Sequence, residues 1–360
     1  MTRLDGFILL ENMLIGDRFH WEKIIKAKLP GEVEIFSLPS KRDITGEITG
    51  NISLINKVPI ETYLECVVGS EMNPLAPMEF LKAHAVISRS WILGKVKGIH
   101  NSGKEGFIDS PDKLVGWYDT SAHQGFDVCS DDHCQRYQGI QDIPENNRRA
   151  IQETAGEVLF QSDGKILDTR FSKCCGGITE KFSTCWQPVD MEALQSFKDP
   201  WCSLSDLTYD KRKYLLSTVL KDYDLSTDNY GYEWEHKISK KEIEENLKKY
   251  FDRNIGKVKR IEVVDRGPSG RIDLMRIAGE KGSLELGKEL WIRRLLSTTH
   301  LYSSAFRIKD KGDMIVLKGK GWGHGVGLCQ IGAANMAFHG HNYREILTFY
   351  YPGSRLSKLS

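Results

Sequence analysis

Apolar residues recur at helical spacing in two neighbouring segments of the first hundred residues. The first segment spans residues 60–68 and stops at Asn73-Pro74, where a proline disfavours further helix. The second opens at Pro77, a residue that suits the first helical position, and its apolar stripe over residues 80–92 ends near Gly98. The pattern predicts two consecutive helices joined by a short turn.

Elsewhere the apolar positions follow the period of two that is typical of strands. Residues 32–55 alternate apolar and polar groups between Pro39, Gly46 and Gly50, which predicts two or three short strands. Residues 99–146 are rich in Gly, Asp, Ser and His and are predicted to form a long loop. Further strands are predicted at residues 158–161, 166–171, 258–264 and 272–277, and further helices at residues 146–153, 240–250 and 343–351.

These elements predict a mixed α+β fold, with helices and antiparallel sheet around one cleft. Residues 1–49 form an N-terminal region of short strands. Residues 186–256 differ in character, because they contain a strongly charged amphipathic helix, and we expect them to form a smaller subdomain inserted into the first.

Composition excludes several classes of protein. Hydrophobic residues make up 40% of the 360 residues, so the chain can bury a core and is not a disordered chain. Fifty basic and forty-nine acidic residues give a formal charge of +1, so no global field favours nucleic acid as a partner. The longest apolar run near the start, residues 6–10, is far shorter than a membrane span or the core of a signal peptide.

Eight cysteines bear on the compartment. Four of them, Cys174, Cys175, Cys185 and Cys202, lie within about thirty residues, a density typical of an oxidising compartment. We therefore expect an exported protein whose leader has been removed from this sequence. The alternative is that several of these cysteines are small buried hydrophobic residues.

Glu71 is the first candidate for chemistry. It follows the apolar residues Val67, Val68 and Gly69, so its carboxyl group is expected to lie in a partly buried corner. A carboxyl group that loses hydration can hold a proton, which a general acid requires. The alternative is a solvated glutamate or a cap for the helix that begins at Pro77.

The second predicted helix carries polar groups on one face. His84, Ser88 and Trp91 are spaced at i, i+4 and i+7 and therefore lie on the same side. Arg89 lies one position further round the helix, where its guanidinium group either faces the same cleft or forms a structural ion pair. The sequence leaves these two roles equally open.

The long loop contains a cluster of residues that bind metals. Cys129 and Cys134, with His123 as the preferred third ligand and His133 as the alternative, match the sulfur and nitrogen ligands of zinc. His133 is less suitable because adjacent residues seldom reach one tetrahedral ion together. A disulfide between Cys129 and Cys134 is the competing interpretation.

A glycine-rich segment lies near the end of the chain. Five glycines alternate with other residues between Gly319 and Gly327, so the backbone there can approach a ligand closely. The segment lacks the spacing of a phosphate-binding or dinucleotide-binding loop. Trp322 and His324 suit stacking on a sugar ring and hydrogen bonding to its hydroxyl groups, and a tight structural turn is the alternative.

Taken in order, these segments resemble the stage II sporulation protein D / amidase enhancer family (SpoIID/LytB). The resemblance covers about residues 50–353, and its four motifs are long. They are the 58–64, 70–72 and 81–90 segments that open the match, the 126–139 loop in a metal-binding version, the 171–180 segment with Cys174-Cys175-Gly176-Gly177, and the 321–333 segment followed by Tyr350-Tyr351-Pro352-Gly353. The resemblance implies one catalytic domain over residues 50–353.

The resemblance further implies a peptidoglycan lytic transglycosylase that acts on glycan strands without stem peptides and yields 1,6-anhydro products. Glu71 matches the position of the family's acid. Arg89 and Lys173 are expected to hold the lactyl carboxylate of muramic acid. Other expected contacts to the glycan come from Ser88, Ser172, Trp322, His324 and Gln330. Zinc is the expected ion, and the chain departs from the family pattern at Cys174, Cys175 and Cys329.

Two other functions stay open. One is a zinc-dependent amidase, and the other is a glycan-binding protein without activity of its own that activates a separate cell-wall amidase. In each case the protein acts outside the cytoplasm, in cell-wall remodelling or in sporulation, with peptidoglycan as its partner.

Overall fold

The computed structural model describes most of the chain. The described residues are 2–4, 6–16, 22–37, 41–42, 48–49, 52–98, 106–117, 125–130, 134–140, 145–220, 232–299 and 301–359. They form a mixed α+β structure with mostly antiparallel sheets, which confirms the predicted fold class. Among them, no helix combines the length and apolar composition needed to cross a membrane.

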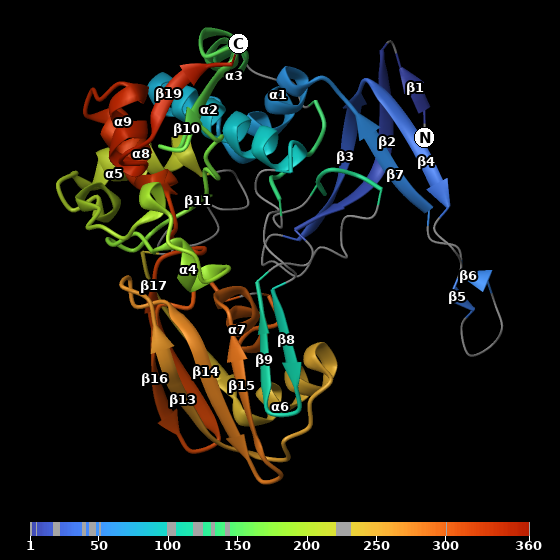
Figure 1. Cartoon of the computed structure of the whole chain (residues 1–360), viewed down its shortest axis with the longest axis vertical. Helices are drawn as coiled ribbons and strands as arrows, with labels where there is room; N and C mark the ends of the chain where they lie inside the picture. The colour runs from blue at the N-terminus through green and yellow to red at the C-terminus, as the bar shows by residue number, and fades with distance from the viewer. Residues whose placement is uncertain are drawn as a thin grey trace.

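The N-terminal residues form small antiparallel sheets. The first sheet has the order β1-β2-β3, and two further pairs are β4-β7 and β5-β6, so the short strands predicted over residues 32–55 are present (Figure 1). Their bounds are β1 (Thr2–Leu4), β2 (Phe7–Ile15), β3 (Lys23–Pro30), β4 (Glu32–Ser37), β5 (Lys41–Arg42), β6 (Ile48–Thr49) and β7 (Ile52–Lys57).

A helical body follows, and it contains the larger hydrophobic core. Its two central helices, α1 (Ile60–Glu71) and α2 (Met78–Val96), confirm the pair predicted from the apolar stripes. Leu64 and Phe80 are completely buried at its centre. The other elements are α3 (Glu145–Glu153), β10 (Glu157–Phe160), β11 (Phe171–Ser172), α4 (Phe182–Cys185), η3 (Glu192–Leu194), η4 (Pro200–Ser203), α5 (Tyr209–Val219), β18 (Leu328–Cys329), α8 (Gln330–Phe338), α9 (Tyr343–Tyr350) and β19 (Arg355–Lys358).

A second body contains two sheets and its own core (Figure 1, lower half). Leu286 and Leu317, one from each sheet, are completely buried there. The sheets have the orders β13-β14-β15-β9-β8 and β12-β17-β16, and only the β15-β9 pair in them is parallel among the described strands. The elements are β8 (Phe107–Ser110), β9 (Lys113–Gly116), β12 (Glu233–Ser239), α6 (Lys240–Phe251), β13 (Val258–Arg266), β14 (Ile272–Gly279), β15 (Ser283–Gly287), α7 (Glu289–Leu295), β16 (Phe306–Lys311) and β17 (Met314–Lys320).

The two cores divide the chain differently from the expected insertion at residues 186–256. Leu194 and Leu215 pack in the first core, whereas Ile243 packs in the second, so this segment contributes to both. The apolar stripe of α6 is buried against β12, β13 and α7 of the second body, contacts that local composition does not reveal. We place the second folding unit at residues 233–320 with the 107–116 hairpin.

That hairpin also differs from the long loop predicted over residues 99–146. β8 and β9 are four residues each, and β9 pairs in parallel with β15, a strand far away in the sequence. The pairing that stabilises them is therefore not visible as a local pattern.

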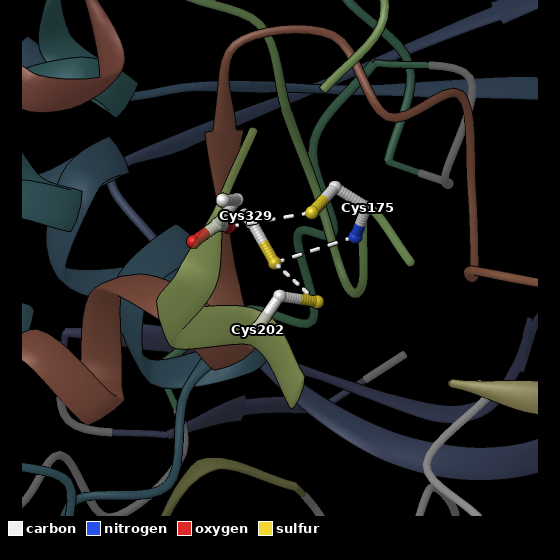
Figure 2. Close-up of side chains that lie close together, drawn as sticks. Cys175, Cys202 and Cys329 are labelled. Carbon is white, nitrogen blue, oxygen red and sulfur yellow. Dashed lines mark hydrogen bonds between the residues drawn. The ribbon is translucent and has the colours of Figure 1, made fainter. Parts of the chain in front are cut away.

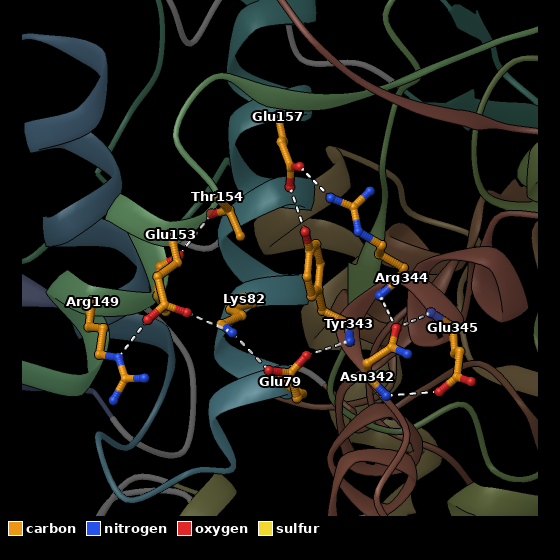
Figure 3. A network of polar contacts seen from close by, with 11 residues as sticks. Glu79, Lys82, Arg149, Glu153, Thr154, Glu157, Asn342, Tyr343, Arg344 and Glu345 are labelled. Carbon is orange, nitrogen blue, oxygen red and sulfur yellow. Dashed lines mark hydrogen bonds and ion pairs between the residues drawn. The ribbon is translucent and has the colours of Figure 1, made fainter.

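Charged side chains join four elements of the helical body (Figure 3). Lys82 of α2 forms ion pairs with Glu79 (2.9 Å) and with Glu153 of α3 (2.7 Å). Glu157 of β10 accepts hydrogen bonds from the Tyr343 hydroxyl (3.0 Å) and from the Arg344 guanidinium (2.7 Å), both on α9. The network fixes the last helix of the chain against the second.

Arg89 makes a similar joint inside the body, and its side chain is 1% exposed. Its Nε and Nη2 donate to the two carboxylate oxygens of Glu61 at 2.9 and 2.8 Å. Its remaining N–H groups reach the carbonyl oxygens of Thr154 (2.9 Å), Glu157 (3.2 Å) and Ile151 (3.4 Å). Since a guanidinium group has five N–H donors, all of them are occupied.

This geometry favours the ion-pair role that the sequence left open for Arg89. A substrate carboxylate would have to displace an existing partner of a buried guanidinium group, at the cost of leaving Glu61 or a carbonyl oxygen unpaired. Arg89 therefore positions α1 against α2 and β10.

We expect Arg89→Met to lower the free energy of unfolding by roughly 3 kcal/mol, because it removes the partner of Glu61 and leaves three buried carbonyl oxygens unsatisfied. Arg148→Met is the control, since Arg148 is exposed and its pair with Glu145 is worth less than about 1 kcal/mol. Chemical denaturation measures both. Equal unfolding midpoints for the two variants would contradict this role of Arg89.

Candidate functional site

The last turn of α1 holds Glu71 against a loop that comes from much later in the chain. Glu71 is only 7% exposed, and its Oε1 accepts a hydrogen bond from the backbone N–H of Arg136 at 3.1 Å. Oε2 makes no hydrogen bond to any residue that the structure describes. One carboxylate oxygen is thus fixed by the fold, and the other is free for a different partner.

The neighbouring Ser70 strengthens the same contact. Its hydroxyl donates to the carbonyl oxygen of Cys66 at 2.6 Å and accepts the backbone N–H of Gln138 at 3.0 Å. Tyr63, two turns earlier on α1, donates from its hydroxyl to Oε1 of Gln135 at 3.0 Å and stacks on Tyr137 with ring centroids 5.6 Å apart. The loop of residues 134–140 is therefore bound along one side of α1.

Burial raises the pKa of Tyr63 well above its usual range, and the nearby Cys134, Cys129 and Glu71 raise it further. The phenol consequently keeps its proton and acts as a hydrogen-bond donor. Because all three groups affect the pKa of Tyr63, the candidate acid and the two cysteines of the loop lie near this one side chain.

The cysteines of the predicted metal site lie next to each other. Cys129 and Cys134 are both half-buried, and the contact with the Cys129 thiol, together with burial, raises the pKa of Cys134. His123 and His133, the predicted histidine ligands, lie outside the described residues. Two adjacent sulfur atoms fit zinc, and they fit the alternative disulfide equally well.

A buried histidine on α2 brings together several other predicted residues. His84 is completely buried, its Nδ1 lies 3.2 Å from the Ser88 hydroxyl, and its Nε2 lies 3.2 Å from Nε2 of Gln330. Burial lowers the pKa of His84 to about 3, and the positive charge of Lys173 adds to this effect. His84 is therefore neutral at physiological pH.

Ser88 and Gln330 are themselves buried, with 0% and 2% of their surface exposed. Groups without exposed surface hold their neighbours in place, so we assign both a positioning role. Lys173 lies beside them, since it is the basic group that acts on His84, and its carbonyl oxygen accepts the backbone N–H of Ile331 at 3.2 Å.

The glycine-rich segment lies against the strand that carries Ser172. The Ser172 hydroxyl accepts the backbone N–H of Gly325 at 3.1 Å, and Trp322 exchanges two backbone hydrogen bonds with Cys174 at 2.7 and 3.1 Å. The His324 ring packs edge-on against Trp186, with centroids 4.8 Å apart. The structure thus brings Ser172, Trp322 and His324 together.

His324 accepts the backbone N–H of Val326 at its Nδ1, at 3.0 Å. Burial lowers its pKa well below the usual range, and the nearby Arg170, Arg271 and Arg293 lower it further. Its imidazole is therefore neutral, with the proton on Nε2.

Sequence reasoning missed the residue that shapes this segment. Arg271 is completely buried and donates to the carbonyl oxygens of Gly323 (3.0 Å) and Cys175 (3.1 Å). A Cβ atom on Gly325 would lie 2.4 Å from the Arg271 guanidinium carbon, and Gly325 also has a φ of +76°. Gly321 and Gly325 are thus required by an arginine from the second body, a contact that no local motif encodes.

Glu180, in the helical body, binds the turn that precedes Arg271. Its Oε2 accepts the hydroxyl of Ser269 at 2.6 Å, and the same hydroxyl accepts Nη1 of Arg271 at 3.0 Å. The turn at residues 267–270, predicted only as the end of a hairpin, therefore connects the two bodies.

The predicted residues form two groups within the described part of the chain. Glu71 with Cys129 and Cys134 forms one, around Tyr63, and Ser88, Gln330 and Lys173 form the other, around His84 and next to the glycine-rich segment. No described hydrogen bond connects Glu71 to the second group. Arg89 belongs to neither.

Two family models match parts of the chain. Residues 49–160 match the family model of the stage II sporulation protein, and residues 180–327 match a domain of unknown function, DUF8618. The first match contains Glu71 and the cysteine loop. The second contains the turn with Arg271 and most of the glycine-rich segment.

Three similar proteins cover different shares of the chain. Stage II sporulation protein D of Bacillus subtilis (strain 168) is 26% identical over 310 residues, which are 86% of this chain and 77% of that protein. An uncharacterized protein of Brachyspira hyodysenteriae is 28% identical over 83% of this chain and 67% of its own length. The amidase enhancer of B. subtilis is 27% identical over 59% of this chain but only 32% of that protein.

We expect stability to fall in mild acid through His84. In the folded chain its pKa is about 3, whereas an unperturbed histidine titrates at 6.5, so the unfolded state binds the proton first as the pH falls. The stability that neutral His84 contributes is complete above pH 6.5 and is lost between 6.5 and about 3.

Between pH 7.5 and 5.0 this effect amounts to about 2 kcal/mol, so His84→Gln should lose about that much less stability than the unchanged protein over the same interval. Denaturant unfolding at the two pH values measures the difference. An identical pH dependence in both proteins would show that His84 is protonated in the fold.

We expect Gly325→Ala to destabilise the protein by more than about 2 kcal/mol, since the new Cβ both meets Arg271 and requires a left-handed backbone. Gly164→Ala is the matched control, because Gly164 has a φ of +82° with no atom within 4 Å of the added Cβ and should cost only about 1 kcal/mol. Thermal unfolding measures both variants. Equal losses would mean that Arg271 does not constrain the loop.

Proposed function

This chain belongs to the stage II sporulation protein D family, and from that premise we propose that it is a peptidoglycan lytic transglycosylase with Glu71 as its acid and base. The observation that carries the proposal is the carboxyl group of Glu71, which is almost buried, fixed through Oε1 and without a described partner at Oε2. A group held in this way can meet a substrate oxygen with little loss of conformational entropy.

The reaction requires one such group. Glu71 donates its proton to the glycosidic oxygen between muramic acid and glucosamine, and the bond from that oxygen to the anomeric carbon of muramic acid breaks. The 6-hydroxyl oxygen of the same muramic acid then bonds to the anomeric carbon, and its proton passes to Glu71. The products are a free 4-hydroxyl group and a 1,6-anhydro ring, and Glu71 ends protonated as it began.

A tethered nucleophile removes the need for a second carboxylate. A hydrolase uses a second carboxylate to activate water or to attack the sugar. Here the nucleophile belongs to the reacting ring, which raises its effective concentration greatly. The backbone N–H of Arg136 keeps the Glu71 carboxylate oriented in both steps.

Lys173 is our proposed contact for the lactyl carboxylate of muramic acid, as Arg89 is fully used inside the fold. Ser172, Trp322 and His324 are proposed sugar contacts, because Ser172 is hydrogen-bonded to the glycine-rich segment that carries Trp322 and His324. Together they offer aromatic surface and polar groups. Ser88 and Gln330 would act through His84, by holding in place the segment that contains Lys173.

Cys129 and Cys134, with His123 or His133, would hold zinc. The ion, when bound, supplies a cross-link between thiolate ligands on either side of residues 131–133. The loop would then hold the N–H of Arg136 toward Glu71 more rigidly. We propose that the protein works outside the cytoplasm on cell-wall glycan, in sporulation or in remodelling.

A second candidate function is activation of a cell-wall amidase. The similarity to a protein named amidase enhancer favours it, although that similarity covers about a third of the relative. A pure activator needs the glycan contacts but not the proton of Glu71, so the residue separates the two functions.

We expect Glu71→Gln to abolish the release of anhydromuramic ends from peptide-free glycan strands, a loss of at least about 1,000-fold, while binding to the strands persists. Mass spectrometry of products and a glycan pull-down measure the two effects. Glu65→Gln, on the same helix, is the matched control and should cleave normally.

The outcomes distinguish the candidates. Anhydro ends from Glu71→Gln would refute the role of Glu71. Free stem peptides from intact peptidoglycan would indicate a zinc amidase, and absence of any product from the unchanged protein would leave the activator.

A further inference from the structure

A second group of potential metal ligands lies away from the predicted zinc loop, in the interior of the helical body. It consists of Cys175, Asp199, Cys202 and Cys329, which come from three separate segments and are all no more than 2% exposed. Their sulfur and oxygen atoms lie within 4.8 Å of one another. In Figure 2 the sulfur atoms of the three cysteines turn toward one another.

The separations fit a tetrahedral ion. Sγ of Cys202 and Sγ of Cys329 are 3.5 Å apart, and Sγ of Cys175 is 3.3 Å from Oδ2 of Asp199. Zinc binds sulfur at about 2.3 Å and carboxylate oxygen at about 2.0 Å, so the edges of its tetrahedron measure about 3.5 to 3.8 Å. The other pairs lie within 4.8 Å, so binding an ion would draw them closer by at most about 1 Å.

Backbone N–H groups point at the sulfur atoms. Cys329 is the N-cap of α8, and its sulfur accepts the N–H groups of Gly332 at 3.4 Å and of Cys175 at 3.3 Å. Such donors, with the positive end of a helix, stabilise thiolates, which are the form that binds metals.

Asp199 is the fourth member and has no counter-charge. The Tyr350 hydroxyl donates to its Oδ2 at 2.9 Å, and the N–H of Trp201 donates to its Oδ1 at 3.0 Å. No basic side chain forms an ion pair with it among residues that the structure describes. Because a buried carboxylate is costly without a positive partner, a divalent cation would account for its place here.

We propose that Cys175, Asp199, Cys202 and Cys329 bind a structural zinc ion, separate from the site at Cys129 and Cys134. The ion joins the segment that follows β11, which carries Cys175, to the start of α8 and to η4. Closed coordination by four protein ligands in a buried site is typical of structural zinc. The site goes beyond the proposed catalytic function and does not depend on it.

Cys174 provides the main competing arrangement. Its Sγ lies 3.4 Å from Sγ of Cys202, so a disulfide between them is the rival to the ion. That disulfide would leave the thiols of Cys175 and Cys329 and the carboxylate of Asp199 without an explanation. Cys174 is adjacent to Cys175, and neighbouring residues seldom bind one tetrahedral ion together.

The test uses the full chain carrying Cys129→Ser and Cys134→Ser, so that the loop site cannot contribute metal. We expect about one zinc per chain by mass spectrometry of the elements, and less than one tenth of that after Cys175→Ser or Cys329→Ser. Cys185→Ser is the matched control, because Cys185 is buried but lies outside the group, and it should retain the ion.

A second measurement needs no change within the group. Titration of the same protein with an organomercurial should release the zinc in step with about three thiols. The proposal is overturned if the protein binds no zinc and its intact mass is two hydrogens lower, which indicates the disulfide. It is also overturned if all thiols are free without zinc, or if Cys175→Ser and Cys329→Ser keep the ion.

Discussion

Two backbone hydrogen bonds at the end of α1 hold the acid of the proposed reaction in place. The N–H groups of Arg136 and Gln138 bond to the side chains of Glu71 and Ser70, so a distant loop is fixed on the last helical turn. The contact buries Glu71 and fixes one of its oxygens. It also brings the Cys129–Cys134 pair next to Tyr63. An acid, an oriented loop and potential metal ligands thus share one anchor.

The rest of the candidate site depends on a joint between the two bodies. Arg271, from the sheet body, donates to the carbonyl oxygens of the glycine-rich segment and of the strand with Cys175. Glu180 fixes the same turn from the helical side. The proposed zinc ion would lie close behind this joint. Two bodies with separate cores are therefore connected by buried polar groups, and those groups also set the conformation of the proposed sugar contacts.

The local pattern of apolar and charged residues predicted the elements that are determined by contacts close in the sequence. The apolar stripes gave α1 and α2, and the charged stripe gave α6, because helical periodicity requires no distant partner. The β8–β9 hairpin and the role of Arg271 were missed because their partners lie far away in the sequence. Composition alone predicted an inserted subdomain over residues 186–256, whereas these residues contribute to both cores. For the site, the motifs predicted Glu71 and the cysteine loop, whereas the complete burial of Ser88, which favours a positioning role, is a property of the whole fold.

A crystal structure of the Glu71→Gln variant with a peptide-free glycan strand tests the central claim most directly. The account predicts a glycosidic oxygen within hydrogen-bond distance of the residue 71 side chain, with the 6-hydroxyl group of the muramic acid facing its own anomeric carbon. A strand bound with every glycosidic oxygen far from residue 71 would contradict it.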